Sequence, residues 1–257
     1  MSATRSDSSA YRPDLGGQVA LVTGAGRGLG EACALALADC GATVLAMSRT
    51  EAELDTLVGT IEASGGTARA LPCDVTDSAA VRDAIESAGQ IDILVNNAGI
   101  NRPQPFVEVD EQSLDLMLDL NVRAAFIVAQ AVARCMLSQG SGSIIHMSSQ
   151  MGRVGAENRT VYCATKHAIE GLTKAMAVEL APAKVRVNAV APTFIETPLT
   201  RPFFEDPTFT DWVMSRIPMG ELGLVEDVVA AVLYLASPGA RLVTGQSIAV
   251  DGGWTAR

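Results

Sequence analysis

The stretch Val19–Gly30, VALVTGAGRGLG, decides the fold, because a short apolar run leads directly into a glycine-rich turn and then into a helical pattern. Such a turn at the carboxyl end of a first parallel strand exposes backbone amides, and its glycines let a pyrophosphate approach closely. The spacing fits TGxxxGxG through Gly24, Gly28 and Gly30, whereas the stricter GxGxxG pattern fails at Leu29. The turn therefore predicts a dinucleotide site, with a plain structural turn as the alternative.

The rest of the chain repeats this alternation of strand and helix. Short apolar runs predict strands at Val19–Val22, Thr43–Met47, Ala68–Cys73, Ile91–Asn96, Ser143–Met147, Arg186–Val190 and Gln246–Val250. Apolar residues three and four apart predict helices at Leu29–Ala38, Glu51–Ser64, Ala79–Ala88, Ser113–Leu137, Tyr162–Leu180 and Val225–Ala236. Since strands that alternate with helices form parallel sheets, we predict one Rossmann-like, doubly wound α/β domain over residues 15–257, with helices on both faces of about seven strands. Residues 1–14 are expected to form a flexible lead.

The composition of the 257 residues excludes several functional classes. The net charge is -10 and the pI is near 4.7, which disfavours nucleic acid and anionic membranes as partners. No stretch approaches the roughly 18 apolar residues of a membrane span, so no membrane contact is expected. His146 and His167 are the two histidines, and the five cysteines lack metal-ligand spacing, so no metal site is predicted. Reduced cysteines and the lack of an apolar leader favour a cytoplasmic location.

The end of the second predicted strand bears on the choice of dinucleotide. NAD sites carry an acidic residue about 20 positions beyond the glycine turn, where it binds the adenosine ribose. Ser48 stands in that place, and Arg49, helped by Arg27, could pair with the 2′-phosphate of NADP. We therefore expect NADP(H) to be favoured over NAD(H). The alternative is that Arg49 is an ordinary solvated side chain with no bearing on the cofactor.

The segment Tyr162-Cys163-Ala164-Thr165-Lys166 places a phenol and an ammonium four residues apart on a predicted helix, and so on one face. A phenol with a pKa near 10 exchanges protons poorly at neutral pH, and a nearby ammonium lowers that pKa by favouring the phenolate. The pair predicts that Tyr162 is a proton donor and acceptor.

Further motifs follow in a fixed order along the chain. They are Asn96-Asn97-Ala98-Gly99, Asp119-Leu120-Asn121-Val122, Ser148-Ser149, Asn188-Ala189-Val190-Ala191-Pro192 and Val250-Asp251-Gly252-Gly253. Together with TGAGRGLG and YCATK, their order and spacing resemble the short-chain dehydrogenase/reductase family from Gly17 to Trp254. The resemblance implies an NAD(P)-dependent oxidoreductase that interconverts a secondary alcohol and a ketone by hydride transfer. It also implies a homotetramer, with the helices 113–137 and 162–180 in one interface and the last strand in another.

The resemblance assigns a catalytic tetrad of Asn121, Ser149, Tyr162 and Lys166. Tyr162 would exchange the proton with the substrate oxygen, and Ser149, thirteen residues earlier, would hydrogen-bond that oxygen. Lys166 would hold the nicotinamide ribose and tune Tyr162, and Asn121 would position a water that relays protons to Lys166. Taken alone, Ser149 could be a turn hydroxyl and Asn121 a helix-interior amide.

The resemblance also assigns the residues that contact the cofactor, in addition to Tyr162 and Lys166. They are Gly24, Arg27, Gly28, Leu29, Gly30, Ser48, Arg49, Asp74, Val75, Asn97, Ala98, Gly99, Pro192, Ile195 and Thr197. Asp74 could instead belong to a helix-capping turn. The family's usual glycine after the proline is Thr193 here, and a β-branched residue disfavours unusual backbone angles, which could reorient the chain at this point.

Residues 193–222 interrupt the alternation of strand and helix. They contain five of the eleven aromatic residues, Phe194, Phe203, Phe204, Phe209 and Trp212, among clustered prolines. Such an insertion predicts a substrate lid, and its alternative is a helical hairpin packed on a partner subunit. Because the lid mixes aromatic with charged side chains, the expected substrate is a sugar, a sugar acid or a small carbonyl compound.

Three other functions compete with this interpretation. A 3-oxoacyl-thioester reductase of the same family is disfavoured because the negative net charge would repel an acidic carrier protein. A catalytically silent, cofactor-binding regulatory protein should have lost a tetrad member, and a lyase or epimerase should have a longer chain. The remaining candidates are given structural roles: Cys163 as a buried filler, the two histidines as non-catalytic, and Trp254 in a subunit boundary.

Overall fold

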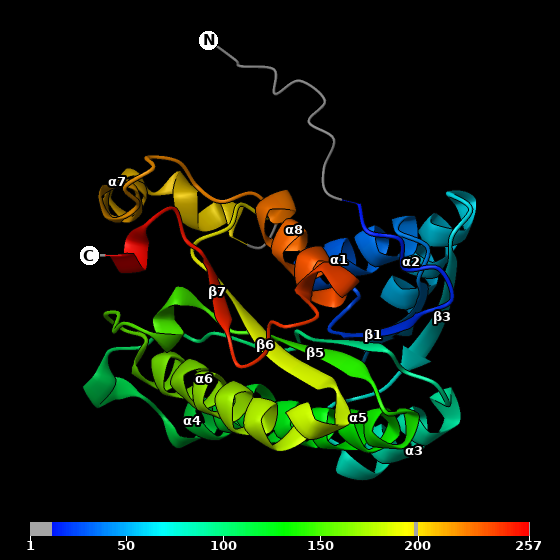
Figure 1. The fold of residues 1–257 in the computed structure, drawn as a ribbon. Helices are drawn as coiled ribbons and strands as arrows, with labels where there is room; N and C mark the ends of the chain where they lie inside the picture. Colours follow the sequence, from blue (N-terminus) through cyan, green and yellow to red (C-terminus); the bar gives the residue numbers. More distant parts are fainter. Residues whose placement is uncertain (1–11, 198–199, 257) are drawn as a thin grey trace.

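The computed structural model describes residues 12–197 and 200–256, so nearly all of the expected flexible lead lies outside it. A seven-stranded sheet of order β3-β2-β1-β4-β5-β6-β7 forms the centre, and every printed strand pair is parallel (Figure 1). The strands are β1 (Val19–Thr23), β2 (Thr43–Ser48), β3 (Thr67–Pro72), β4 (Ile93–Asn96), β5 (Gly142–Met147), β6 (Val185–Pro192) and β7 (Ser247–Val250). This order confirms the Rossmann-like, doubly wound sheet.

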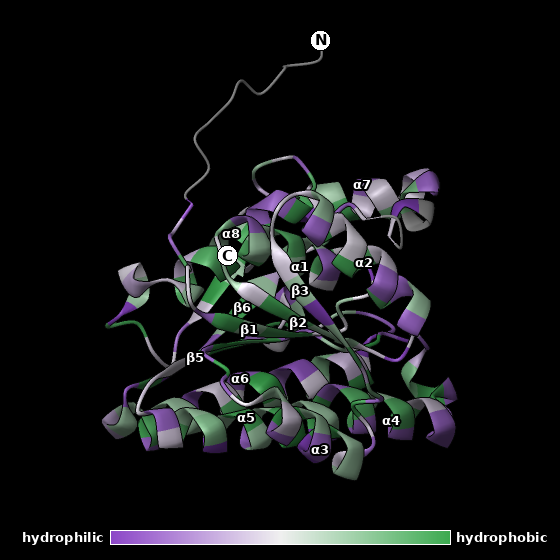
Figure 2. Cartoon of the chain, turned by 90° about the vertical axis from the view of Figure 1, so that its right-hand side faces the viewer, coloured by the Kyte–Doolittle hydropathy of each residue, from purple (hydrophilic) through white to green (hydrophobic). Residues whose placement is uncertain are grey.

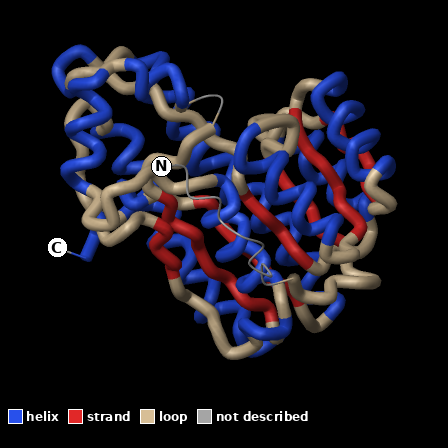
Figure 3. The backbone as a smooth tube through the Cα atoms, turned by 90° about the horizontal axis from the view of Figure 1, so that it is seen from above, coloured by secondary structure: helices blue, strands red, loops and turns tan. Residues whose placement is uncertain are grey.

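Helices cover both faces of the sheet, as Figure 3 shows from above. They are α1 (Gly28–Asp39), α2 (Glu51–Ala63), α3 (Ser78–Ala88), α4 (Glu111–Leu118), α5 (Ala125–Gln139), α6 (Thr160–Leu180), α7 (Pro207–Arg216) and α8 (Val225–Ala236). The helices α1, α2 and α8 lie on one face and α3 to α6 on the other (Figures 1 and 2). The predicted elements are therefore present, with ends that shift by at most two residues.

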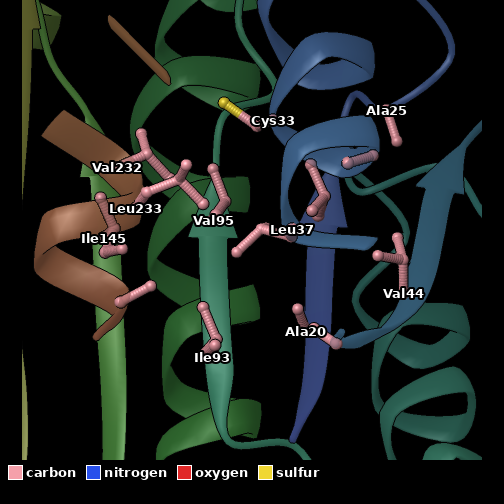
Figure 4. Close-up of a cluster of buried hydrophobic side chains, with 14 of the residues drawn as sticks. Ala20, Ala25, Cys33, Leu37, Val44, Ile93, Val95, Ile145, Val232 and Leu233 are labelled. Carbon is pink, nitrogen blue, oxygen red and sulfur yellow. The ribbon is translucent and has the colours of Figure 1, made fainter. Parts of the chain in front are cut away.

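The core has two layers because both faces of the sheet are buried. Along β4, Ile93 and Val95 face α1 and α8, where Leu37 packs beside them (Figure 4). Leu94 points to the opposite face and packs with Val128 of α5. This alternation lets one apolar strand serve two cores, and it leaves the strand ends as the place for polar chemistry.

The predicted helix Ser113–Leu137 is one helical run from Glu111 to Gln139, interrupted by a π-helical turn at Asp119–Ala124. Among the described helices it alone is long and apolar enough to cross a membrane, with a mean hydropathy of 1.5, which the sequence interpretation did not anticipate. In this fold 44% of its most apolar 18-residue window is buried, and Val132 packs against the sheet. The run therefore serves here as a core helix.

His146 of β5 is buried, with 1% of its surface exposed. Its Nδ1 lies 3.4 Å from Nδ2 of Asn96, so the amide donates and the imidazole accepts. Burial, followed by the charge of Lys166, lowers the pKa of His146 to about 4. The imidazole is therefore neutral at pH 7, as its structural role requires.

This burial makes the stability of the protein sensitive to acid. The unfolded chain binds a proton at His146 with a pKa of about 6.5 and the folded chain with a pKa of about 4, so stability is lost as the pH falls through this window. Between pH 7 and pH 4, the wild type should lose about 3 kcal/mol more free energy of unfolding than His146→Gln, measured by urea denaturation. The exposed His167→Gln control should match the wild type. Equal pH dependence in the wild type and His146→Gln would contradict the assignment.

Candidate active site

The strand order reverses between β1 and β4, and this arrangement opens a crevice at their carboxyl ends. The glycine turn between β1 and α1 lies there. Gly24 and Gly28 have φ values of +64° and +60°, which L side chains rarely adopt. A Cβ on Gly30 would lie 2.1 Å from the carbonyl oxygen of Gly24. These positions require glycine, so the geometry of the turn fits the close approach of a pyrophosphate. Leu29 lies between Gly28 and Gly30 on the first turn of α1.

Thr23 joins the ends of β1 and β4, a role that the sequence interpretation missed. Its buried hydroxyl accepts the backbone N–H of Asn97 at 2.9 Å and that of Ala98 at 3.0 Å. The Asn97 side-chain amide donates to the carbonyl of Thr23 at 3.0 Å. The expected contacts Asn97, Ala98 and Gly99 are thereby held beside the glycine turn. A polar residue that closes an otherwise apolar strand was the available signal, since buried hydroxyls need partners.

The expected adenosine contacts gather at the ends of β2 and β3. Arg49 is largely exposed, and its Nη1 lies 3.9 Å from Oδ2 of Asp74. Asp74 accepts the N–H and the hydroxyl of Thr76 at 2.9 and 2.7 Å, whereas Asp77 caps α3. The carboxylate of Asp74 therefore forms a turn and also faces Arg49. Val75, the next residue, is buried.

Glu53, in the first turn of α2, is a second residue that the sequence interpretation missed. A Cβ on Gly26 would lie 2.4 Å from Oε2 of Glu53 and 3.2 Å from Oγ of Ser48. The carboxylate therefore stands between the glycine turn and Ser48, where an adenosine ribose was expected. It opposes a 2′-phosphate, whereas the exposed Arg27 and Arg49 attract one.

Lys166 and Tyr162 meet on one face of α6, which packs on β6 (Figure 1). Nζ of Lys166 donates to the carbonyl of Met147 at 2.7 Å and lies 5.5 Å from the centroid of the Tyr162 ring. Burial lowers the pKa of Lys166 to about 8, although the charge of Glu170 opposes this shift. The ammonium is thus fixed under the phenol by a main-chain oxygen.

The pKa of Tyr162 shifts in the direction opposite to the one expected from its lysine neighbour. Burial raises the pKa of Tyr162 to about 12, and the nearby Ser149 hydroxyl acts to lower it. The expectation of a lowered phenol pKa was wrong for the protein alone, because loss of solvation outweighs the attraction of nearby groups. The phenol therefore keeps its proton at neutral pH.

The two adjacent serines after β5 face different partners. Oγ of Ser149 donates to Oε1 of Gln150 at 2.6 Å and lies 3.4 Å from the carbonyl oxygen of Pro192. Oγ of Ser148 donates instead to the buried Glu170 at 2.6 Å. The structure thus brings Ser149, and not Ser148, to Tyr162. Gln150 is an additional polar group at this point that the sequence interpretation did not single out.

Asn121 lies in the π-helical turn, and its side chain is fully engaged within the protein. Oδ1 accepts the N–H of Ile100 at 2.8 Å, while Nδ2 donates to the Ile100 carbonyl at 2.8 Å and to the Thr165 hydroxyl at 3.2 Å. The side-chain amide therefore ties the loop after β4 to α6. The side-chain hydrogen bonds of Asn121 thus go to protein groups, and its expected part in positioning a water stays a prediction.

The segment after β6 carries the remaining expected cofactor contacts. Pro192 ends β6, and Ile195 and Thr197 are both buried. Thr193 donates its N–H to Val250 at 3.0 Å, and among the described non-glycine residues only Asn158 and Lys184 have a positive φ. Thr193 therefore continues the pairing of β6 with β7 in ordinary backbone geometry, and its position does not require a glycine.

The predicted lid forms a short 3-10 helix at Arg201–Glu205 and then α7. Its aromatic side chains cluster: the ring centroids of Phe194 and Trp212 lie 6.2 Å apart, and those of Phe194 and Trp254 lie 5.7 Å apart. Trp254 therefore packs against the lid aromatics of its own chain, and its expected place at a subunit boundary stays a prediction. The side chain of Phe203 lies outside the described part.

A cavity of about 400 Å³ opens between this cluster and the loop before α6. Its lining consists of Gly155, Ala156, Glu157, Trp212, Arg216 and Trp254. Arg216 lies 5.1 Å from the Trp212 ring, a cation–π distance. Among the residues described, no group of three or more His, Cys, Asp or Glu side chains could hold a metal ion.

Comparisons with known proteins place this geometry in a family. Residues 24–255 match the family model described as enoyl-(acyl carrier protein) reductase. The L-xylulose reductase of Mesocricetus auratus is 44% identical over 241 residues, which cover 93% of this chain and 97% of that protein. The gluconate 5-dehydrogenase of Gluconobacter oxydans is 40% identical over 245 residues, which cover 94% and 96% of the two chains.

The solved structures agree with the sequence relatives. The gluconate 5-dehydrogenase of Burkholderia cenocepacia, crystallised in complex with NADP and tartrate, superposes with a TM-score of 0.92 at 37% identity, covering 97% of this chain and 100% of that one. The resemblance inferred from the motifs is thereby confirmed. This chain belongs to the short-chain dehydrogenase/reductase family and is an NAD(P)-dependent oxidoreductase that acts on CH–OH groups.

Proposed function

We propose that this oxidoreductase interconverts a secondary alcohol and a ketone on a sugar or a sugar acid, with NADP(H) favoured over NAD(H). The observation that carries the proposal is the convergence of Tyr162, Lys166 and Ser149 at the edge of the sheet that also holds the glycine turn. The similarity to an L-xylulose reductase and to gluconate 5-dehydrogenases supports the substrate class.

When bound, NADP(H) would supply or accept the hydride, and the residues of this chain would transfer the proton. Tyr162, whose raised pKa keeps it protonated, donates its phenolic proton to the carbonyl oxygen during reduction. The Ser149 hydroxyl hydrogen-bonds the same oxygen and stabilises the charge that develops on it. The Lys166 ammonium, held by the Met147 carbonyl, keeps a positive charge beneath the phenol.

Other residues of the site would hold the cofactor, the water and the substrate in place. The Asn121 side chain fixes the loop after β4, so a water relay at this residue would use its main-chain carbonyl in the π-helical turn. The glycine turn, Asn97 and the segment Pro192–Thr197 would hold the cofactor along the crevice. We propose that residues 193–222 act as the substrate lid, since their aromatic cluster borders the cavity.

The charge and the residues of this chain argue against two competing functions. The net charge of -10 would repel an acidic carrier protein, which argues against a 3-oxoacyl-thioester reductase. All four tetrad residues are present, which argues against a silent regulatory protein. Oxidoreduction of a sugar or a sugar acid therefore remains the proposed function.

Removal of the phenolic hydroxyl tests the chemistry. Tyr162→Phe should lower kcat by about 100- to 10,000-fold, because the carbonyl oxygen loses its proton donor. NADPH binding, measured by fluorescence titration, should persist. The control Tyr234→Phe changes a tyrosine of α8 remote from the site and should leave kcat unchanged. If Tyr162→Phe kept more than about a tenth of wild-type kcat, the assigned proton donor would be wrong.

Two side chains of opposite charge test the choice of dinucleotide. Arg49→Ala should weaken NADPH binding by about tenfold and leave NADH binding nearly unchanged, because only NADPH carries the 2′-phosphate. Glu53→Gln should shift the ratio of the two dissociation constants toward NADPH, since it removes a carboxylate beside Ser48. Isothermal titration with both dinucleotides measures these ratios. Unchanged ratios in both variants would contradict the NADP(H) assignment.

We also propose that the protein is a homotetramer. Apolar side chains stay exposed along the run from α4 to α5 and on α6, where soluble surfaces usually carry polar residues. They are Leu114, Leu118, Phe126, Leu137 and Val178. Multi-angle light scattering should give four times the chain mass of 26.8 kDa.

Charge placed on that surface tests the tetramer. Phe126→Glu should reduce the particle mass, because a buried carboxylate without a partner opposes association. Leu242→Glu, at a side chain that is 86% exposed on another segment, is the matched control and should keep the wild-type mass. A monomeric wild type, or a tetramer that tolerates Phe126→Glu, would contradict the proposed interface.

A further inference from the structure

Arg159 immediately precedes α6, and no feature of the fold accounts for it. Its side chain is half-buried and makes no capping hydrogen bond to the helix. No residue in the described ranges forms an ion pair or a hydrogen bond with its guanidinium, and its Nε is fully buried. Buried polar groups nearly always have partners, so an arginine held without one points to a ligand.

The placement of Arg159 is also unfavourable for stability. The residue before a helix is best as Ser, Thr, Asp or Asn, and a cation there faces the positive end of the helix dipole. A half-buried guanidinium without a partner adds a desolvation penalty. Its main-chain carbonyl accepts the N–H of Cys163 at 2.8 Å and so opens α6, a role that any residue could fill. The side chain is therefore best explained by function.

Arg159 lies near the reacting end of the site. It is the N-cap of α6, with a non-helical backbone (φ −133°, ψ 24°), three residues before Tyr162 and seven before Lys166. Helical side chains lean toward the N-terminus, so the Tyr162 ring lies over the turn that Arg159 begins. The charge of Arg159 acts to lower the pKa of Tyr162, which agrees with this proximity.

The loop that ends at Arg159 borders the cavity beside the lid. Asn158 accepts the N–H of Gln104 at 2.9 Å, which joins the loop after β4 to the loop before α6. Gly155, Ala156 and Glu157 line the cavity only two to four residues before Arg159. Glu157 is exposed and does not pair with Arg159. An unpaired positive charge thus directly follows the cavity-lining loop in the chain and lies near the proton donor.

We propose that Arg159 recognises a carboxylate of the substrate, so that the preferred substrate is a sugar acid and not a neutral sugar. The planar guanidinium matches a carboxylate with two parallel hydrogen bonds, which a hydroxymethyl group cannot form. A chain of net charge -10 repels anions at long range, so an acidic substrate needs a local cation of this kind. This inference rests on the proposed function and narrows its substrate class.

A matched pair of ketones tests Arg159. 5-Keto-D-gluconate and L-sorbose differ only in a carboxylate against a hydroxymethyl group, and both are reduced at saturating NADPH. The wild type should prefer the acid in kcat/KM by at least about tenfold. Arg159→Ser should lower kcat/KM for the acid by about 10- to 100-fold, mainly through KM, and leave the value for L-sorbose within about threefold.

The same substitution separates recognition from a structural role. Since serine caps helices, Arg159→Ser should raise Tm by about 2–4 °C, whereas a structural arginine would lower it when removed. Arg216→Ser, at the other arginine beside the cavity, is the matched control and should keep the preference for the acid. Loss of the preference in Arg216→Ser alone, or an equal loss for both ketones in Arg159→Ser, would overturn the assignment.

A binding measurement decides the inference independently of turnover. Tartrate and threitol also differ only in carboxylate against hydroxymethyl groups. Tartrate should raise the Tm of the wild-type NADP⁺ complex and threitol should not, and Arg159→Ser should abolish the tartrate effect. If the wild type reduces neither ketone, the proposed function fails. If it reduces both ketones and tartrate stabilises Arg159→Ser as well as the wild type, only the assignment of Arg159 fails.

Discussion

Parallel pairing of the seven strands brings their carboxyl ends to one edge of the sheet, and every functional side chain depends on this constraint. The hydroxyl of Thr23 secures the edge by accepting two N–H groups from the end of β4. The glycine turn follows β1, the serine pair follows β5, and Pro192 ends β6. Residues that are far apart in sequence thereby surround one crevice.

Burial shapes the chemistry of that edge in two opposite ways. It lowers the pKa of Lys166 to about 8 and raises the pKa of Tyr162 to about 12, because in each case it disfavours the charged form. A neutral phenol over a lysine that the Met147 carbonyl holds in place suits donation of a proton to a ketone. The charge of Arg159 partly offsets the penalty on the phenolate.

The sequence predicted the parallel sheet because its apolar runs and helical periods reflect burial, which is the main determinant of local structure. It also predicted the meeting of Tyr162 with Lys166, since a helical spacing of four is a local property. The contacts of Glu53 and Thr23 join distant segments, so their partners do not follow from a local pattern. The burial that leaves the Arg159 guanidinium without a partner also depends on the folded chain. The sign of the Tyr162 pKa shift was missed for the same reason, because desolvation depends on the whole surrounding structure. The π-helical turn at Asn121 likewise leaves no distinctive residue pattern.

The residues at this edge support hydride transfer between a nicotinamide and a carbinol carbon. Reduction of 5-keto-D-gluconate and of L-sorbose with NADPH deuterated at the nicotinamide C4, followed by mass spectrometry and NMR of the alcohols, tests it most directly. With the label on the transferred face, we expect one deuterium on the new carbinol carbon of each product molecule and none from deuterated water. Product without this label, whichever face of the nicotinamide carries the deuterium, would contradict direct hydride transfer.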